Sequence, residues 1–481
     1  MRDDELRQWL RERNPWWRAA VPGADPLGWV RADVTLRGAD ALGIDYRPPI
    51  LADVQPGGLY VVRGPRRVGK SVALKRFAAD LLDRADLHPS QVIYLTVDEF
   101  DTRAFRRALR LGRELTPAAA TLPRFWLIDE VTAVAGWPAV LKSARDDTLL
   151  AHDTVVVTGS SAHGLNEARR ALGAGRVGPA RDPFRLLLPM SFRDFAAAVG
   201  RELPGLPAIG AAVTQSQELR DALTGVVPFA DELDLAWQAY CEVGGFPRAV
   251  GEFRRSGTVS TEFGTDLVAW LSADVTPDNP PESTLRLLST LGQRMSAPLN
   301  ARSVAQATGL SRERLTTRLH RLLATFGAFT CPQVDDEGAP IAGAQSKTYL
   351  IDPLLARLPS LVEDGFPVPE LPVISEAALA ATIARAAERA HPGRLLDGRA
   401  VGYARTAAGG EVDFAPMPIR IDTVAQSTTP VESKWVSDGW RPGARAIEGK
   451  YGRGFVATKN ILDTAHAAWA LPAGALALLL E

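Results

Sequence analysis

Residues 64–71 read Gly-Pro-Arg-Arg-Val-Gly-Lys-Ser, which places two glycines, a lysine and a serine at the spacing of a phosphate-binding P-loop. Glycines let the backbone turn tightly, so that its N–H groups can surround phosphate oxygens. We expect Lys70 to neutralise the β- and γ-phosphates of ATP and the hydroxyl of Ser71 to bind Mg²⁺. The predicted nucleotide contacts are Gly64, Pro65, Arg66, Arg67, Val68, Gly69, Lys70, Ser71 and Val72.

A pair of acidic residues, Asp129 and Glu130, follows the apolar run at residues 125–128. We expect Asp129 to hold the same Mg²⁺ and Glu130 to orient or activate the attacking water. An acidic residue after a strand also serves as a helix N-cap, so the pair alone does not decide the chemistry. Together with the P-loop it predicts Mg²⁺-dependent ATP hydrolysis, in which Lys70 and Glu130 are catalytic.

Three further residues are candidates for contact with the γ-phosphate. Ser160 follows the apolar run at residues 155–157 and could act as a polar sensor, although a helix N-cap role fits it equally well. Arg176 and Arg248 each follow a turn that contains glycine, and each is a candidate arginine finger or lid sensor, with an ordinary surface arginine as the alternative. A finger can act between subunits, so the sequence leaves a homo-oligomer open.

Short apolar runs alternate with helical stretches between residues 56 and 195, which predicts an α/β domain whose parallel sheet is covered by helices on both faces. Residues 1–55 are expected to form an N-terminal arm, and residues 196–279 a helical lid. The expected strands lie at residues 59–62, 92–95, 125–128, 155–157 and 184–188.

Residues 280–358 show three helical patterns, at 281–291, 301–308 and 311–326, and then a hairpin pattern at 328–332 and 347–351, which together predict a winged helix. Seven arginines and one acidic residue lie between residues 286 and 321. This local surplus of positive charge favours a DNA backbone contact without sequence specificity. The alternative is a charged face that binds protein. The predicted DNA contacts are Arg312, Arg314, Arg318 and Arg321.

A proline-spaced linker at residues 359–372 is expected to precede a C-terminal domain at residues 373–481. Asp413 lies in one predicted strand, and Glu432 and Lys434 lie two residues apart in another, on one face. This set resembles the PD-(D/E)xK nuclease site, in which carboxylates hold a metal ion and the lysine positions water. Glu376 in the preceding helix is a further candidate ligand. The alternative is a charged pair on an exposed sheet face.

Several motifs together, namely Asn14-Pro-Trp-Trp, the P-loop, the acidic pair, Thr158-Gly-Ser-Ser, Leu188-Pro-Met-Ser-Phe and Gly244-Gly-Phe-Pro, resemble the prokaryotic AAA-type ATPases of the archaeal-ATPase-like group. The resemblance implies three parts, namely a P-loop ATPase, a winged helix and a restriction-endonuclease-like α/β domain. It also implies ATP and Mg²⁺ as cofactors and suggests association with DNA.

The composition sets limits on partners and compartment. The formal net charge of −1 gives no overall attraction to polyanions, so a nucleic-acid site has to come from a local basic face. The two cysteines, Cys241 and Cys331, and the lack of an apolar signal or spanning segment predict a cytoplasmic protein without membrane contact. The leading hypothesis is an ATP-hydrolysing motor or switch that moves its winged helix and C-terminal domain on DNA. The alternatives are an ATP-controlled signalling or scaffold protein and an ATP-gated nuclease.

Overall fold

The computed structural model describes residues 2–19, 25–116, 122–147, 149–162, 164–173, 175–407, 409–421 and 424–481. The chain divides into two units, Met1–Leu187 and Leu188–Glu481. The predicted ATPase sheet lies in the first unit. The regions predicted as a lid, a winged helix and a C-terminal domain all lie in the second. No helix in the described part of the chain is both long and apolar enough to span a membrane.

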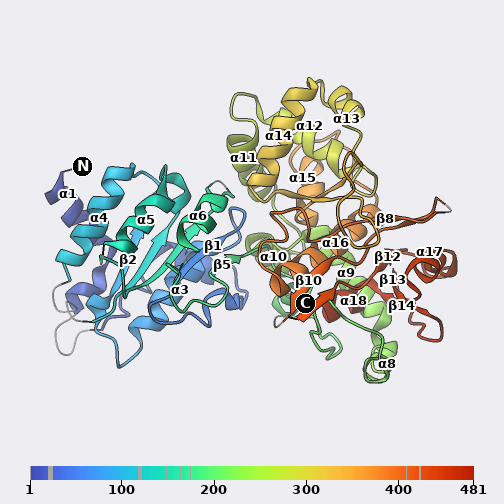
Figure 1. Cartoon of the computed structure of the whole chain (residues 1–481), viewed down its shortest axis with the longest axis horizontal. Coiled ribbons are helices and arrows are strands. Elements are labelled where there is room, and N and C mark those ends of the chain that lie inside the picture. Colours follow the sequence, from blue (N-terminus) through green and yellow to red (C-terminus); the bar gives the residue numbers. More distant parts are fainter. Residues whose placement is uncertain are drawn as a thin grey trace. The chain divides into compact units, whose positions relative to one another are not determined.

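A five-stranded parallel sheet forms the centre of the first unit (Figure 1). Its strands are β1 (Leu59–Arg63), β2 (Val92–Thr96), β3 (Phe125–Asp129), β4 (Thr154–Gly159) and β5 (Phe184–Leu186). They are arranged in the order β2-β3-β4-β1-β5. The predicted α/β sheet is confirmed. Its apolar runs are uninterrupted because both faces of the three inner strands are buried.

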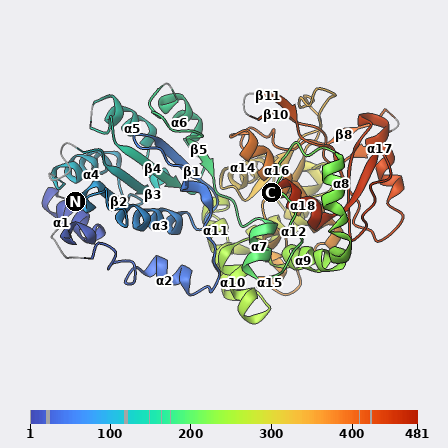
Figure 2. The ribbon, with the colours of Figure 1, turned by 90° about the horizontal axis from the view of Figure 1, so that it is seen from below.

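Helices cover both faces of this sheet. They are α1 (Asp3–Arg13), α2 (Val34–Asp40), α3 (Lys70–Leu82), α4 (Thr102–Glu114), α5 (Trp137–Asp146) and α6 (Leu165–Leu172). The chain passes from β1 to β2 in one direction across the sheet and returns through β3 to β4 in the other. Because crossover connections are right-handed, α3 packs on one face and α4 and α5 on the opposite face (Figure 1 and Figure 2). The loop before α3 therefore lies at the carboxyl edge of the strands.

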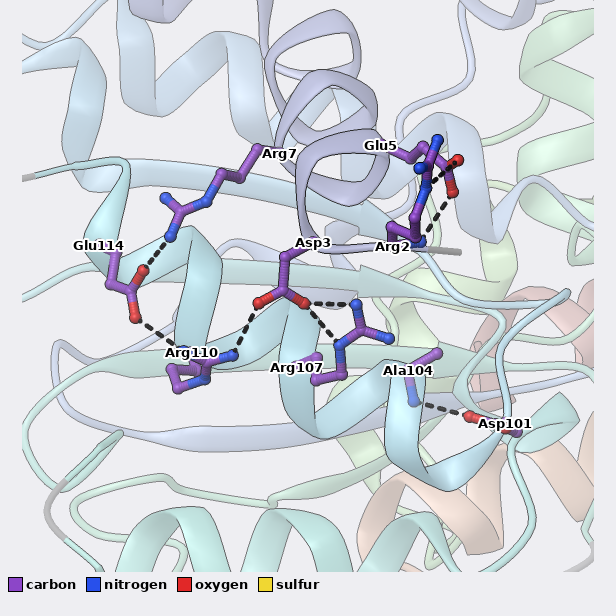
Figure 3. A network of polar contacts seen from close by, with 9 residues as sticks. All are labelled: Arg2, Asp3, Glu5, Arg7, Asp101, Ala104, Arg107, Arg110 and Glu114. Atoms are coloured by element: carbon purple, nitrogen blue, oxygen red, sulfur yellow. Dashed lines mark hydrogen bonds and ion pairs between the residues drawn. The ribbon is translucent and has the colours of Figure 1, made fainter.

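Helix α1 packs against α4 and buries Leu6 and Leu10. Ion pairs also link the two helices (Figure 3). Asp3 accepts a hydrogen bond from Arg107, and it accepts another from Arg110 at 3.3 Å. These pairs are partly exposed, so most of the stability of the contact comes from the buried leucines.

The N-terminal arm continues past α1 along the outer edge of strand β2. The buried side chain of Asn14 accepts a hydrogen bond from the N–H of Tyr94 at 2.6 Å and donates to the carbonyl of Tyr94 at 3.0 Å. The indole N–H groups of Trp16 and Trp17 both donate to the carbonyl of Val92 at 2.9 Å. Side chains of the arm thus satisfy the edge-strand groups that a further strand would otherwise pair.

The second unit contains a three-stranded parallel sheet, three two-stranded antiparallel sheets and twelve helices among its described residues (Figure 1). Its helices are α7 (Phe192–Ala198), α8 (Gln217–Thr224), α9 (Ala230–Val243), α10 (Pro247–Ser256), α11 (Thr261–Val275), α12 (Pro281–Gly292), α13 (Ala301–Thr308), α14 (Arg312–Ala324), α15 (Pro353–Val362), α16 (Leu371–Ala390), α17 (Arg441–Tyr451) and α18 (Ala473–Leu480). Its strands are β6 (Ala328–Cys331), β7 (Lys347–Leu350), β8 (Ala404–Arg405), β9 (Glu411–Val412), β10 (Pro418–Ile421), β11 (Val424–Ser427), β12 (Val431–Ser433), β13 (Gly454–Thr458) and β14 (Ala468–Pro472).

Helices from distant parts of the sequence share one core in this unit. Helix α9, from the region predicted as a lid, packs against α16 and α18. Phe192 and Trp237 meet edge to face with ring centroids 5.1 Å apart, and the indole of Trp237 donates to the hydroxyl of Ser375 at 2.8 Å. The apolar helix α18 is buried along its whole length, which explains its uniformly hydrophobic sequence.

The elements predicted for residues 280–358 are present as three helices, α12 to α14, and the hairpin of β6 with β7. The predicted linker at residues 359–372 is shorter than expected, because α15 continues to Val362 and α16 begins at Leu371. Pro372 is tolerated there because the first turn of a helix does not use the backbone N–H of a proline.

We predict that Asn14→Ala lowers the free energy of unfolding by about 3 kcal/mol, because two buried backbone groups of Tyr94 lose their partner. Guanidinium denaturation followed by tryptophan fluorescence measures this change. Arg18→Ala, an exposed site on the same arm, is the matched control and should change the free energy by less than about 0.5 kcal/mol. Equal effects of the two variants would contradict this role for Asn14.

Candidate functional site

The loop at residues 64–69 connects β1 to α3 and requires glycine at two positions. Gly64 has φ +152°, and a Cβ atom there would lie 1.8 Å from the carbonyl oxygen of Leu187. Gly69 has φ +95° and caps the N-terminus of α3. At Gly64 a side chain would collide with backbone, and at Gly69 the positive φ favours glycine, so the spacing of the motif follows from the shape of the loop.

Lys70 begins α3 and turns its ammonium group back toward the loop. The residue is 5% exposed, and its Nζ donates to the carbonyls of Gly64 at 3.0 Å and Pro65 at 2.7 Å. Lys70 makes no ion pair with the described residues, since no carboxylate oxygen lies within 4.0 Å of its Nζ. Burial lowers the pKa of Lys70 to about 8, and the negative charges of Glu130 and Asp129 offset only part of this shift. A phosphate group would supply the missing counter-charge.

Asp129 lies at the carboxyl end of β3, where the two neighbouring strands supply hydroxyl groups. Its Oδ2 accepts from the hydroxyl of Tyr94 on β2 at 3.1 Å, and its Oδ1 accepts from the hydroxyl of Thr158 on β4. Burial, and then the charge of Asp129, raises the pKa of Tyr94 well above its usual value, so the phenol remains a donor. The carboxylate is thereby fixed at the sheet edge, in reach of the loop.

Glu130 follows in a left-handed conformation with φ +56°, which turns its side chain away from the direction of the strand. Its backbone N–H donates to the hydroxyl of Thr158 at 3.2 Å, and its Oε2 accepts from the hydroxyl of Ser160 at 3.1 Å. Ser160 therefore orients Glu130, a role that differs from direct contact with a phosphate.

The loop and the acidic pair fit Mg²⁺ and a nucleoside triphosphate. Ser71 is in the first turn of α3, and Asp129 supplies a buried carboxylate from β3, which β4 separates from β1. Hydroxyl and carboxylate oxygens are the ligands that Mg²⁺ prefers, and a nucleotide phosphate completes such sites. The N-terminus of α3 adds partial positive charge toward the phosphates.

Arg63 is a residue of this site that sequence reasoning missed. It ends β1 immediately before the loop, is 2% exposed, and lies with its guanidinium carbon 5.6 Å from the ring centre of Trp137. Burial lowers its pKa to about 9, and the charge of Glu130 acts in the opposite direction. The available signal was an arginine at the end of an otherwise apolar strand.

The two arginines predicted as finger or sensor are held by carboxylates within their own units. Arg176 pairs with Asp146 through Nε at 2.7 Å. Arg248 pairs with three acidic residues: Glu252, Glu262 and Asp266. A role in catalysis would require these ion pairs to break, so both assignments remain predictions.

Helix α14 exposes Arg312, Arg314 and Arg321, but Arg318 is buried. The helix packs against α11 as well as α13, and Arg321 donates to the carbonyl of Val275 at the end of α11. Burial lowers the pKa of Arg318, and its positive neighbours add to the shift. The expectation that Arg318 belongs to an exposed basic face is therefore wrong, because helical periodicity does not show which side of α14 other elements cover.

In the second unit, the structure brings Glu376, Asp413, Glu432 and Lys434 into one cluster. Lys434 pairs with Glu432 at 3.1 Å, and Glu432 accepts from the backbone N–H of Asp413 at 3.2 Å. The backbone N–H of Ser433 donates to the second oxygen of Asp413 at 3.0 Å. Burial, followed by the nearby charge of Asp413, raises the pKa of Glu432 to about 8.

Two residues of this cluster were missing from the sequence prediction, namely Lys347 on β7 and Glu411 on β9. The ammonium group of Lys347 lies 2.9 Å from Glu411, 3.0 Å from Asp413 and 3.2 Å from Glu376. Burial alone would lower the pKa of Lys347, but these carboxylates raise it overall. Lysine occurs at only seven positions in the sequence, and this scarcity was the signal that could have identified Lys347.

The cluster does not fit a resident metal ion as it stands. The ammonium group of Lys347 already binds the carboxylates of Glu376 and Asp413, and both oxygens of Glu432 accept other bonds. Within the described residues, no group of three or more acidic, histidine or cysteine side chains is arranged to hold a metal. The alternative of an exposed charged pair, Glu432 with Lys434, fits only in part, because the side chain of Lys434 is 46% exposed whereas that of Glu432 is buried.

Comparison with known proteins gives one family match, to the model of an AAA domain over residues 57–196. No curated protein matches the chain. Similar solved structures include a Walker-type ATPase of Pyrococcus abyssi, with 14% identity over 67% of this chain and 95% of that chain and a TM-score of 0.33. A RuvB variant of Thermotoga maritima has 13% identity over 68% of this chain and 89% of that chain, with a TM-score of 0.26. The ORC2 protein of Aeropyrum pernix has 12% identity over 68% of this chain and 93% of that chain, with a TM-score of 0.29.

These TM-scores are too low for any of the three structures to define the fold of the whole chain. The family match covers the parallel sheet, the phosphate-binding loop and the acidic pair. Residues 57–196 are therefore similar in sequence to an AAA domain, and in the structure they contain the parallel sheet, the loop and the acidic pair.

Proposed function

We propose that the chain hydrolyses ATP with Mg²⁺ and uses the nucleotide state of its first unit to control DNA binding by its second. The observation that carries the ATPase part is the buried ammonium group of Lys70, which has only loop carbonyls as partners. Such a group gains most from a bound polyanion. Neutralising the β- and γ-phosphates is then the role of Lys70, and Ser71 and Asp129 hold the magnesium ion that the nucleotide brings.

The chemistry assigned to the chain's own residues is positioning and proton transfer. Glu130, oriented by Ser160, accepts a hydrogen bond from the attacking water and takes up its proton. Tyr94 and Thr158 keep Asp129 in place, so that the metal ligand does not turn toward Lys70. An arginine from a neighbouring copy would complete the site, and Arg176 and Arg248 remain the candidates for that role in a homo-oligomer.

DNA binding is proposed for the exposed part of the basic face of α14. Arg312, Arg314 and Arg321 are available for phosphate contacts after Arg318 is excluded. A protein partner on the same face is the second candidate, supported by the smaller number of free cations. Metal-dependent cleavage is left out of the proposed function, because Lys347 binds the carboxylates that a nuclease needs for metal.

We predict that Glu130→Gln retains ATP binding but slows hydrolysis by about 100-fold or more, because the water loses its proton acceptor. Steady-state phosphate release and binding of a fluorescent ATP analogue measure the two properties. Glu167→Gln, an exposed glutamate on α6, is the matched control and should hydrolyse at the wild-type rate. Wild-type turnover in Glu130→Gln would remove Glu130 from the mechanism.

ATP binding should also take up protons from solution above pH 8. Lys70 is largely neutral there in the free protein, because its pKa is about 8, whereas bound phosphates favour its charged form. Nucleotide phosphates, with a pKa of about 6, do not titrate in this range. Calorimetry of a non-hydrolysable analogue in two buffers of different ionisation enthalpy gives the uptake. It should be larger at pH 8.8 than at pH 7.2, and an equal uptake at both would contradict the assignment.

Replacing Arg312 and Arg314 by alanine should weaken duplex DNA binding and reduce the salt dependence of log Kd by about 2, roughly one unit per lost phosphate contact. Fluorescence anisotropy at several KCl concentrations measures this slope. The double variant Arg254→Ala and Arg255→Ala, on the exposed side of α10, changes the net charge equally and should leave the slope unchanged. Absence of DNA binding by the wild type, or equal slopes for both variants, would favour the protein-binding alternative.

A further inference from the structure

The carboxylate cluster of the second unit already contains a cation, which is supplied by the chain itself. The side chain of Lys347 is fully buried, and its ammonium group contacts three carboxylates from two elements: Glu376 of α16, and Glu411 and Asp413 within and just after β9. The ring of Tyr403 lies beside the same group, 5.6 Å from Nζ to the ring centre. Ion pairs in three directions and an aromatic ring enclose the charge.

We propose that Lys347 takes the place of a divalent metal ion in this cluster, and that the cluster is a clasp between the hairpin β6–β7 and the C-terminal elements rather than a metal-dependent catalytic site. This inference is independent of the proposed function of the first unit. It assigns a structural purpose to buried acidic residues whose types and spacing otherwise indicate metal chemistry.

The ammonium group and a divalent ion would compete for the same oxygens. Mg²⁺ binds carboxylate oxygens at about 2.0–2.1 Å and demands several of them in a near-octahedral arrangement. Lys347 holds one oxygen each of Glu376, Glu411 and Asp413 at hydrogen-bond distances, and a second cation among them would meet a buried positive charge. The second oxygen of Asp413 is used by the N–H of Ser433.

Two side chains of strand β7, those of Lys347 and Tyr349, contact the cluster. Lys347 and Tyr349 are two residues apart and share one face of the strand. The hydroxyl of Tyr349 donates to Glu376 at 2.6 Å, on the same oxygen that Lys347 contacts. A second link between hairpin and C-terminal elements comes from Val334, whose N–H donates to the carbonyl of Tyr403 at 2.9 Å. Lys347 and Tyr349 of β7 therefore join the hairpin to the acidic residues of the C-terminal elements.

The test uses the full-length, nucleotide-free protein and Mn²⁺ as the probe, with free Mn²⁺ measured by electron paramagnetic resonance. Wild type and Asp413→Asn should bind Mn²⁺ equally, because the cluster holds none. Lys347→Met keeps the length of the side chain but removes its charge. It should bind one additional Mn²⁺ ion, which the further change Asp413→Asn removes. Its melting temperature should lie below that of the wild type and rise when Mn²⁺ is added.

Two results would overturn the proposal. One is a Mn²⁺ ion in the wild type that is lost in Asp413→Asn or Glu432→Gln, since a metal would then coexist with Lys347. The other is a folded Lys347→Met protein that binds no additional Mn²⁺, since the cluster would then lack the properties of a cation site. If Lys347→Met does not fold, the comparison of wild type with the two carboxylate variants still decides whether a metal is excluded.

Discussion

A lysine ammonium group that is removed from water needs anionic or strongly polar partners, and the two most buried lysines of this chain meet that need in opposite ways. Lys70 is surrounded by carbonyls of a glycine-containing loop and has no ion-pair partner among the described residues. Lys347 has three carboxylates. We propose that a phosphate ligand completes the first arrangement, whereas the second is complete without one. Much of what the two units can do follows from this difference.

The geometry around Lys70 depends on the order of the strands. Because β2, β3 and β4 are neighbours and parallel, Tyr94 and Thr158 meet the carboxylate of Asp129 from both sides. The N-terminal arm extends this support, since Asn14 binds the backbone of Tyr94 on the open edge of the sheet. A residue far from the loop in the sequence therefore helps to fix the carboxylate of Asp129, the proposed metal ligand, in the way that outer partners orient the groups they support.

The sequence predicted the parts of the fold that local patterns determine. Each apolar run of the first unit became a strand of the parallel sheet, and the glycine spacing placed Lys70 correctly at the start of α3. Contacts between distant segments were not predictable in this way. The burial of Arg318 depends on what packs around α14, and the position of Lys347 among the acidic residues depends on how the hairpin packs. Periodicity identifies a face of a helix or strand, but it does not identify what covers that face.

The most direct test of these two cation sites is to locate Mn²⁺ by its anomalous scattering. The crystals would contain the full chain and a non-hydrolysable ATP analogue. Two sites bear carboxylates that could bind the ion. We predict one peak, bound by Ser71, Asp129 and the nucleotide phosphates, and none among Glu376, Asp413 and Glu432. A peak at that cluster with Lys347 still in place, or no peak beside the phosphates, would contradict this prediction.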